Sequence, residues 1–520
     1  MAIKIILLVV FFAVMIFVGT SCRKHSVDVN GFVLGSRSVG PWLTAFAYGT
    51  SYFSAVIFVG YAGQFGWNFG MASTWIGLGN AFIGSLLAWC ILGRRTRIMT
   101  QHLGSKTMPE YFGQRYESNK LKIAASAITF IFLVPYTASL FNGLSRLFGM
   151  AFSIDYAYCV IGMAILTGIY VIVGGYMATA VNDFIQGIIM IFGIIAVIAA
   201  VLSQNGGLMG SIIELSKVES GVMEGAYTSF LGPEPLYLLV VVLLTSLGTW
   251  GLPQMVGKFY AIKSESSIQK GTIISTLFAI IVAGGCYFLG GFGRLFATQE
   301  QVSANGFDSI IPSMLSGLPD ILIAVVLVLV LSASMSTLSS LVLTSSSTLT
   351  LDLIAPVKKK EMTEKSKISI MRIFIAFFII VSAVIAIVQA KSKVTFIAQL
   401  MGISWGALAG AFLAPFLYGL YWKKTTKASV VASFIFGTGI MIIQLLISLG
   451  LITVSGGFLG FIFRNSLYSG VFAMLGSLVI VPVVSLLSRK TTPANVDSMF
   501  TCYDRTVEVH ATTALSDKKD

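Results

Sequence analysis

Charged residues are scarce in this chain. Of its 520 residues only 11% are Asp, Glu, Lys or Arg, whereas 56% are hydrophobic and the mean hydropathy is +0.89. A soluble domain carries about a quarter charged residues, so this deficit excludes a water-soluble enzyme, a disordered protein and a nucleic-acid-binding protein. The net charge of +13 does not indicate a nucleic-acid-binding protein, because the basic residues lie in short loops between apolar runs. The composition predicts a multi-pass transmembrane protein.

Histidine and cysteine are also few. His25, His102 and His510 lie in loops or in the terminal tail, so no catalytic dyad or zinc site is expected inside the membrane. The five cysteines, an odd number, form neither a disulfide framework nor a paired metal-ligand spacing. We therefore expect no enzyme activity, no catalytic residue and no cofactor.

Long apolar runs dominate what is present. A helix needs about 20 apolar residues to cross roughly 30 Å of hydrocarbon, and thirteen runs meet this length. They cover residues 3–20, 41–65, 70–93, 123–149, 154–174, 180–203, 235–257, 271–292, 320–350, 370–390, 396–421, 428–450 and 467–488. Only Lys4 precedes the first run, whereas Arg23 and Lys24 follow it, which favours an uncleaved helix with its N-terminus outside over a signal peptide.

The basic residues predict the orientation of the chain in the cell membrane. With thirteen spans the C-terminus is inside, and the outer side then holds seven of the 34 Lys and Arg residues and the inner side 27. We expect the lipid bilayer as surroundings and no obligate protein partner. The predicted parts are an extra helix with an inner loop (1–40), a five-helix repeat (41–204), an outer loop (205–234), a second repeat (235–421), two further helices (422–488) and a mobile cytoplasmic tail (489–520).

Two spans carry interruptions that a passive anchor does not need. Residues 48–52 read Tyr-Gly-Thr-Ser-Tyr, and residues 247–253 read Leu-Gly-Thr-Trp-Gly-Leu-Pro. Glycine and proline free backbone carbonyls at membrane depth, where they are tolerated only against protein or a water-filled cavity. Each interruption lies in the first helix of a five-helix group, an arrangement typical of transporters that work by alternating access. The alternative is that these glycines only allow close helix packing.

Hydroxyl groups crowd the span 320–350, where Ser336, Ser339 and Ser340 share one helix face and Thr337 borders it. They either bond to the preceding turn as packing contacts or hold a hard monovalent cation through neutral oxygens. In the second case the hydroxyls of Ser336 and Thr337 join the carbonyls of Thr50, Phe53 and Ala333.

Asp183 is the one acidic residue that we place inside a span. A carboxylate at mid-membrane costs about 2.5–3.5 kcal/mol, so such residues usually serve function. The alternative is a helix cap at the interface. We expect Asp352, at the inner surface, to be a cap or solvated.

Three segments resemble the sodium:solute symporter family, which includes sodium/proline, sodium/sialic acid and sodium/galactose transporters. They are the run from Gly168 through Val-Gly-Gly-Tyr-Met-Ala (173–178) to Asn-Asp-Phe-Ile-Gln (182–186), Ala-Ser-Met-Ser-Thr-Leu-Ser (333–339) and, more softly, residues 54–60. Tyr176 departs from the Leu, Met or Phe usual in the family. The similarity extends over roughly residues 1–490 and implies an all-α membrane fold, the inverted repeat of five plus five helices named after the bacterial leucine transporter, with about thirteen transmembrane helices.

The resemblance also implies ion sites. It implies a first sodium ion at Thr50, Phe53, Ala333, Ser336 and Thr337, in agreement with the interpretation from oxygens alone. Some members hold a second sodium ion with an aspartate and two serines, whose positions are occupied here by Asp183, Ser339 and Ser340.

The solute is less constrained by the resemblance. Tyr136 and the segment with Pro253 and Gln254 resemble the proline branch, but the acidic residue of that branch is Tyr52 here, and Thr245 and Thr249 replace two aromatics. Ser51 and Ser54 resemble pantothenate and monocarboxylate carriers, and Ile57 in place of the sugar-branch glutamine argues against a hexose. The implied solute residues are Ser51, Ser54, Ile57, Tyr136, Thr249, Pro253 and Gln254.

We find no Arg or Lys that we expect deep in the core, so a solute carboxylate would rest on backbone N–H groups at the breaks. These features together predict sodium-coupled symport of a small organic solute, with an amino acid such as proline as the first candidate. Alternatives are a monocarboxylate, pantothenate or proton-coupled carrier and, in another class, a membrane solute sensor.

Overall fold

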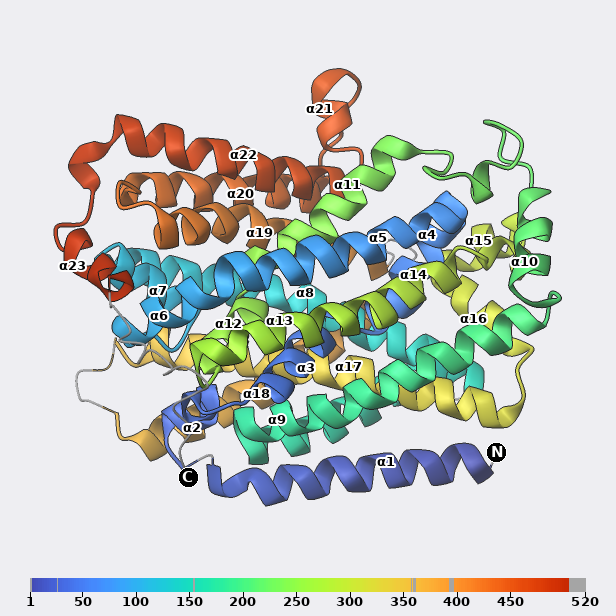
Figure 1. The fold of residues 1–520 in the computed structure, drawn as a ribbon, viewed down its shortest axis with the longest axis horizontal. Helices are drawn as coiled ribbons and strands as arrows, with labels where there is room; N and C mark the ends of the chain where they lie inside the picture. Colours follow the sequence, from blue (N-terminus) through green and yellow to red (C-terminus); the bar gives the residue numbers. More distant parts are fainter. Residues whose placement is uncertain are drawn as a thin grey trace, which may run out of the picture.

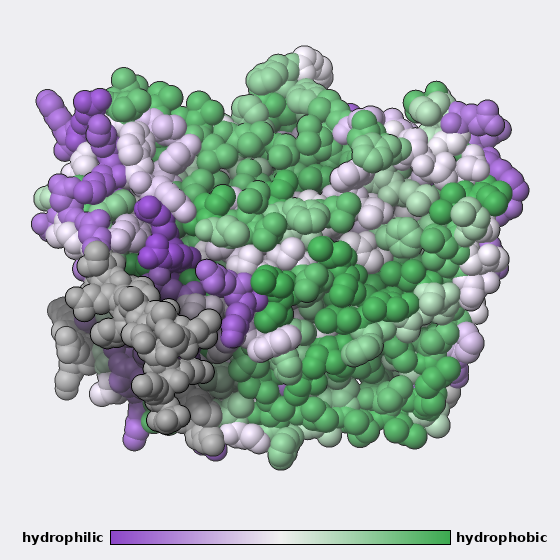
Figure 2. All heavy atoms as spheres, viewed as in Figure 1, coloured by the Kyte–Doolittle hydropathy of each residue, from purple (hydrophilic) through white to green (hydrophobic). Residues whose placement is uncertain are grey.

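The chain is a layered bundle of helices in a computed structural model that describes residues 2–25, 27–152, 155–356, 358, 362–391 and 397–504 (Figure 1). Within these ranges the β pairing is limited to an isolated bridge between Val39 and Ile262. The all-α prediction is confirmed. Figure 2 shows a broad hydrophobic band across the helices, with hydrophilic residues gathered towards their two ends.

Side chains in this band are large, apolar and exposed, as lipid contact requires. Phe17, Phe192 and Ile435 are 71%, 70% and 67% exposed. Ten helices in the described residues are long and apolar enough to cross a membrane, and a pair bent by 48° makes eleven.

The thirteen predicted runs correspond to helices that the structure partly joins and partly divides. One helical segment, Val56–His102, joins the end of the run 41–65 to the whole of the run 70–93, and Gly175, at φ 58° and ψ −155°, divides α9 (Tyr156–Ser203). The other long helices are α1 (Ala2–Ser21), α8 (Asn119–Phe152), α13 (Glu265–Ala279), α17 (Asp320–Thr348), α18 (Glu364–Lys391), α19 (Ile397–Tyr421), α20 (Lys427–Ser448) and α22 (Ser466–Leu487).

Both predicted interruptions are breaks in the structure, and one of them is displaced along the chain. Residues 48–52 are helical: α3 (Pro41–Tyr52) ends after them, Phe53 is extended at φ −91° and ψ 127°, and helix resumes at Ala55 before η3 (Val56–Tyr61). The second break lies at Leu252, also extended, between η8 (Leu247–Gly251) at the end of α11 (Pro235–Ser246) and α12 (Pro253–Ala261).

The helix α17 lies at the centre of the bundle and contacts α1, α2 (Val29–Leu34), α3, α8, α9, α12 and α18. It is rich in serine and threonine, yet its hydroxyls are almost all buried. α19 is the most buried span; it packs on α8, η3 and η8 and against α20 and α22. Both breaks therefore face helices of the protein interior rather than lipid.

Contacts at the two ends tie distant segments together. At the end that carries the N-terminus in Figure 1, the Lys4 ammonium lies 2.8 Å from a carboxylate oxygen of Asp320. At the other end, the carboxylate of Glu117 accepts hydrogen bonds from the N–H groups of Ala494 (3.0 Å) and Asn495 (3.1 Å). In the predicted topology, Lys4 and Asp320 both lie on the outer side, and Glu117 and Ala494 both lie on the inner side.

The first part of the predicted mobile tail is packed. α23 (Val496–Phe500) follows α22, and Phe500 is buried with the guanidinium carbon of Arg115 5.1 Å from its ring centroid. Met499 and Cys502 are buried beside it. Burial of these apolar side chains stabilises the packed segment. The polar composition of the tail as a whole did not indicate it. Residues 505–520 lie outside the described part of the chain.

Substitution of Gly251 tests whether the second break depends on close packing against α19. A Cβ atom at Gly251 would lie 2.9 Å from both Cα of Ala409 and N of Leu413, whereas a Cβ at Gly257 meets nothing within 4 Å. We expect Gly251→Ala to destabilise the protein by about 1–3 kcal/mol through overpacking, and Gly257→Ala to leave it folded. Thermal unfolding in detergent measures both. Equal stability of the two variants would contradict the packing role of Gly251.

Candidate functional site: converging oxygens at the helix breaks

The predicted oxygen atoms of the first sodium site come together where α3 ends against the middle of α17. The Ser336 hydroxyl lies 3.0 Å from the carbonyl oxygen of Ala333 and 3.1 Å from that of Thr50. Thr337 Oγ1 lies 3.1 Å from the Ala333 oxygen and 3.2 Å from those of Thr50 and Phe53. All five residues are buried.

This cluster contains more acceptors than donors. Each hydroxyl has one hydrogen to donate, yet four carbonyls converge on the single hydroxyl of Thr337, because the Ser51 oxygen also lies 3.5 Å away. The contacts of these hydroxyls with the Ala333 oxygen are bonds within α17, as the packing alternative requires. That alternative does not explain why the hydroxyls also lie close to the carbonyls at the end of α3. Surplus oxygen lone pairs, all neutral, can coordinate a hard monovalent cation.

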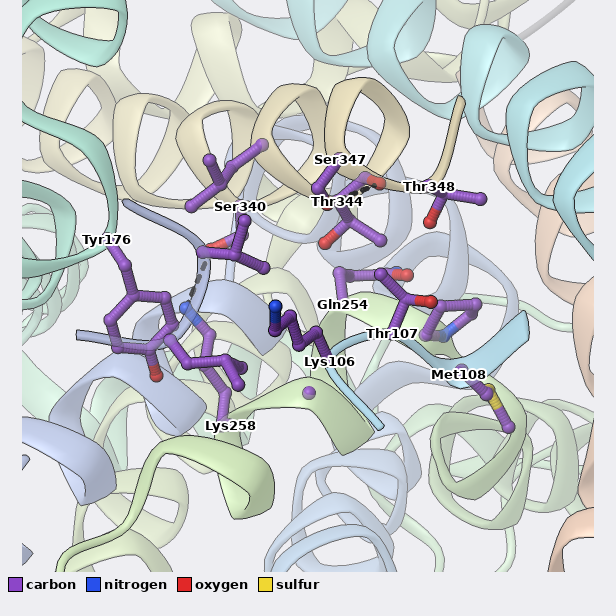
Figure 3. Close-up of a pocket in the computed structure, with 15 residues that line it drawn as sticks. Lys106, Thr107, Met108, Tyr176, Gln254, Lys258, Ser340, Thr344, Ser347 and Thr348 are labelled. Atoms are coloured by element: carbon purple, nitrogen blue, oxygen red, sulfur yellow. Dashed lines mark hydrogen bonds between the residues drawn. The ribbon is translucent and has the colours of Figure 1, made fainter. Parts of the chain in front are cut away.

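A second cluster surrounds Asp183, and it contains a basic residue that the sequence did not lead us to expect. The Lys258 ammonium lies 3.7 Å from Oδ2 of Asp183 and donates a hydrogen bond to Ser340 Oγ at 2.9 Å; Figure 3 shows the latter. Ser340 Oγ in turn lies 2.8 Å from Ser51 Oγ. The ammonium also lies 5.4 Å from the ring centroid of Tyr176.

The prediction that the core holds no Lys or Arg is therefore wrong. Lys258 is 3% exposed, because α12 turns inward after the break at Leu252 and a carboxylate is there to receive the ammonium. The cap interpretation of Asp183 is wrong too. Asp183 lies well inside the second half of α9, and its carboxylate accepts no hydrogen bond from the described residues. Ser339 bonds to its own helix, at the carbonyl of Ser336 (2.9 Å).

A narrow cavity opens beside this cluster, with room for about 40 Å³ of water, enough for a few molecules and too little for an amino acid. Pro253, Gln254, Lys258 and Ser340 line it, together with Lys106 of a loop that we predict to be cytoplasmic (Figure 3). The cavity thus leads from the end of the bundle that carries Lys106 towards the second break.

Asp352 lies near this end, in η12 (Leu349–Ile354), and it is neither solvated nor a cap. Its side chain is buried and accepts a short hydrogen bond from the Thr107 hydroxyl. The loop that carries Thr107 covers the end of α17, which removes Asp352 from water.

An aromatic group lies on the other side of the first break. The rings of Tyr136 and Trp405 meet edge to face, with centroids 5.9 Å apart, and Tyr52 stacks on Trp405 at 6.0 Å. The Tyr136 hydroxyl is beside the side chains of Ser54 and Trp405. Ser54 Oγ, Tyr136 OH and Trp405 Nε1 are buried, and none makes a well-oriented hydrogen bond to another described residue.

Buried polar groups without partners at one place indicate a ligand site. Sequence reasoning found Ser54 and Tyr136 but missed Trp405. A signal existed, because tryptophan usually lies at the membrane interface and Trp405 lies well inside its span.

The remaining predicted solute residues are divided between these places. Ile57 is buried on η3, which packs against α8 and α19 near the aromatic group. Ser51 joins the Lys258 cluster, and Pro253 and Gln254 line the narrow cavity. Thr249 donates its hydroxyl to the carbonyl of Ser246 at 2.8 Å, so its own turn satisfies it.

Comparisons with known proteins identify the family and the fold of the chain. The family model described as "Sodium:solute symporter family" matches residues 32–437. Two relatives named sodium/proline symporter, from Staphylococcus aureus and its strain JH9, are 27% and 28% identical over 494 and 495 residues, and each alignment covers 93% of both chains.

Among solved structures, a Na⁺-coupled sialic acid symporter in a substrate-bound, outward-open state matches with a TM-score of 0.71 at 16% identity, over 93% of this chain and 98% of that one. At this identity the likeness concerns the fold, and it confirms the predicted inverted repeat. The function class is that of a transporter rather than an enzyme. On the match of the family model, this chain belongs to the sodium:solute symporter family.

Proposed function

We propose that the chain imports a small organic solute together with sodium, and that the first sodium ion binds the five oxygens at the end of α3. The observation that carries the proposal is the convergence of the Thr50, Phe53 and Ala333 carbonyls on the single hydroxyl of Thr337. A sodium ion at this place would coordinate the oxygen lone pairs that receive no hydrogen bond. Neutral ligands suit a coupling ion because they release it readily on the inner side.

Sodium at this place would couple ion and solute through α3 and α17, which belong to different repeats of the predicted fold. The ion joins the end of α3 to the middle of α17, and the residues directly after the break lead to the aromatic group. A membrane potential contributes about 2.3 kcal/mol per charge per 100 mV to inward movement. This free energy can drive the accumulation of a solute that binds at the aromatic group beside the ion.

For the solute we propose a small amino acid, with proline first. Support comes from the two relatives named sodium/proline symporter and from the aromatic group itself. The Tyr136 and Trp405 rings offer apolar walls for a compact ring and electron-rich faces for a substrate ammonium. Ser54 and the N–H groups after the break can receive a carboxylate. Monocarboxylates, pantothenate and proton coupling are the competing outcomes of the solute and ion tests.

Removal of one hydroxyl tests the sodium site. We expect Thr337→Ala to raise the sodium concentration for half-maximal uptake about tenfold, as loss of an ion contact worth about 1.4 kcal/mol would. Ser334→Ala is the matched control, since Ser334 is buried in the same helix and bonds to the Val330 carbonyl of its own helix at 2.7 Å. Sodium-dependent uptake of labelled proline into proteoliposomes measures both. An equal sodium constant in the two variants would return Thr337 to a packing role.

Removal of the Tyr136 hydroxyl tests the solute site. We expect Tyr136→Phe to raise the half-saturation concentration for the solute about three- to tenfold, the range of a single hydrogen bond, with less effect on the sodium constant. Tyr111→Phe is the control, because the Tyr111 hydroxyl is also buried without a described partner but lies on α7 (Met108–Arg115), which packs on α8. Unchanged uptake in both variants would refute a solute contact at Tyr136.

The sensor alternative predicts binding without turnover. Wild-type protein that gains thermal stability from proline and sodium but accumulates no proline in sealed vesicles would favour that alternative over transport.

A further inference from the structure

We propose that the Lys258 ammonium takes the place of the second sodium ion beside Asp183, so that one sodium ion, not two, accompanies each solute molecule. This inference rests on the proposed sodium-coupled transport and concerns how many ions it uses. On this proposal, Lys258 determines the number of sodium ions transported with each solute molecule.

The first argument is position. Residues expected to ligate a second sodium ion are Asp183, Ser339 and Ser340, and the ammonium of Lys258 touches two of the three. Nζ lies 2.9 Å from Ser340 Oγ and 3.7 Å from Asp183 Oδ2. A sodium ion held by the same carboxylate and hydroxyl would have to occupy nearly the same space.

The second argument is charge. Asp183 is fully buried, and neither of its carboxylate oxygens accepts a hydrogen bond from the described residues, so a cation is needed to balance it. Lys258 is the basic residue that the structure brings within 4 Å of this carboxylate. Once the ammonium is in place the pair is neutral, and little electrostatic attraction remains for a second cation.

The third argument is attachment. Lys258 follows the break at Leu252 by less than two helical turns, and with Gln254 it lines the narrow inner cavity. A sodium ion released into that cavity leaves the protein and carries its charge across the membrane. An ammonium attached to α12 cannot leave, so it balances Asp183 throughout the cycle without adding an ion to the transport ratio.

Equilibrium binding of ²²Na⁺ to the purified full-length protein tests this inference without any knowledge of the solute. We expect one site in the wild-type protein, and about tenfold weaker binding at that site in Thr337→Ala. Two wild-type sites would overturn the role of Lys258 and leave the proposed function intact. No sodium binding at all, with Thr337→Ala identical to the wild type, would overturn the proposed function and this inference with it.

Three variants then test Lys258 directly. We expect Lys258→Met, which keeps the length of the side chain and removes its charge, to bind two sodium ions and to become more stable in sodium than in choline by a wider margin than the wild type. Lys258→Met combined with Asp183→Asn, in which both charges are gone, should bind one. Lys258→Arg, in which the positive charge is kept, should also bind one. A folded Lys258→Met protein with a single site would overturn the inference; if this variant does not fold, the wild-type site count still decides.

Discussion

A helix that ends in the middle of a membrane must find partners for its last carbonyl groups, and this requirement shapes the centre of the protein. α3 ends at Tyr52, and the oxygens of Thr50 and Phe53 receive hydroxyls from α17 in place of the next helical turn. Water is absent at this depth, so an unmet carbonyl would be costly. The hydroxyls of α17 must therefore be held firmly in the interior, which accounts for a polar helix surrounded by seven others.

The contact between Asp183 and Lys258 has a different physical character. Each charge alone would be expensive at membrane depth, whereas together they form a neutral pair between α9 and α12. Such pairs add little net stability, because desolvation offsets much of the attraction. Their effect is to specify an arrangement: α12 has to turn inward after Leu252 for the ammonium to reach its partner. The pair thus links the second break to the first repeat, just as the hydroxyls of α17 link the first break to the second.

The groups that surround the two breaks differ in their chemistry. Around the first, neutral oxygens and aromatic edges offer coordination and hydrogen bonds without fixed charge. Around the second, a charged pair lies beside a small cavity that Lys258 lines. A site of unsatisfied hydroxyl and indole groups selects strongly for solutes that can bond to them, because a solute that lacks those groups leaves them buried and unpaired. Specificity in this protein is therefore expected from Ser54, Tyr136 and Trp405 rather than from an ion pair with the solute.

Local patterns in the sequence were sufficient for the all-helical class, for the approximate place of both breaks and for the five oxygens at Thr50, Phe53, Ala333, Ser336 and Thr337. The apolar runs extend along the chain, the glycines and hydroxyls that indicate the breaks and the oxygens lie within short segments of it, and burial in lipid leaves the backbone few alternatives. The position of the first break needed the structure, since Phe53 and Ser54 look no less helical than the glycine-containing turn before them. Trp405 needed it as well, because its role arises only where α19 packs on α8 and Tyr52 at the end of α3 stacks on the Trp405 ring. Lys258 is the clearest case: its sequence position suggests an inner loop, and only the bend of α12 towards Asp183 decides that it is buried, because a charge enters the interior when tertiary packing brings it a partner.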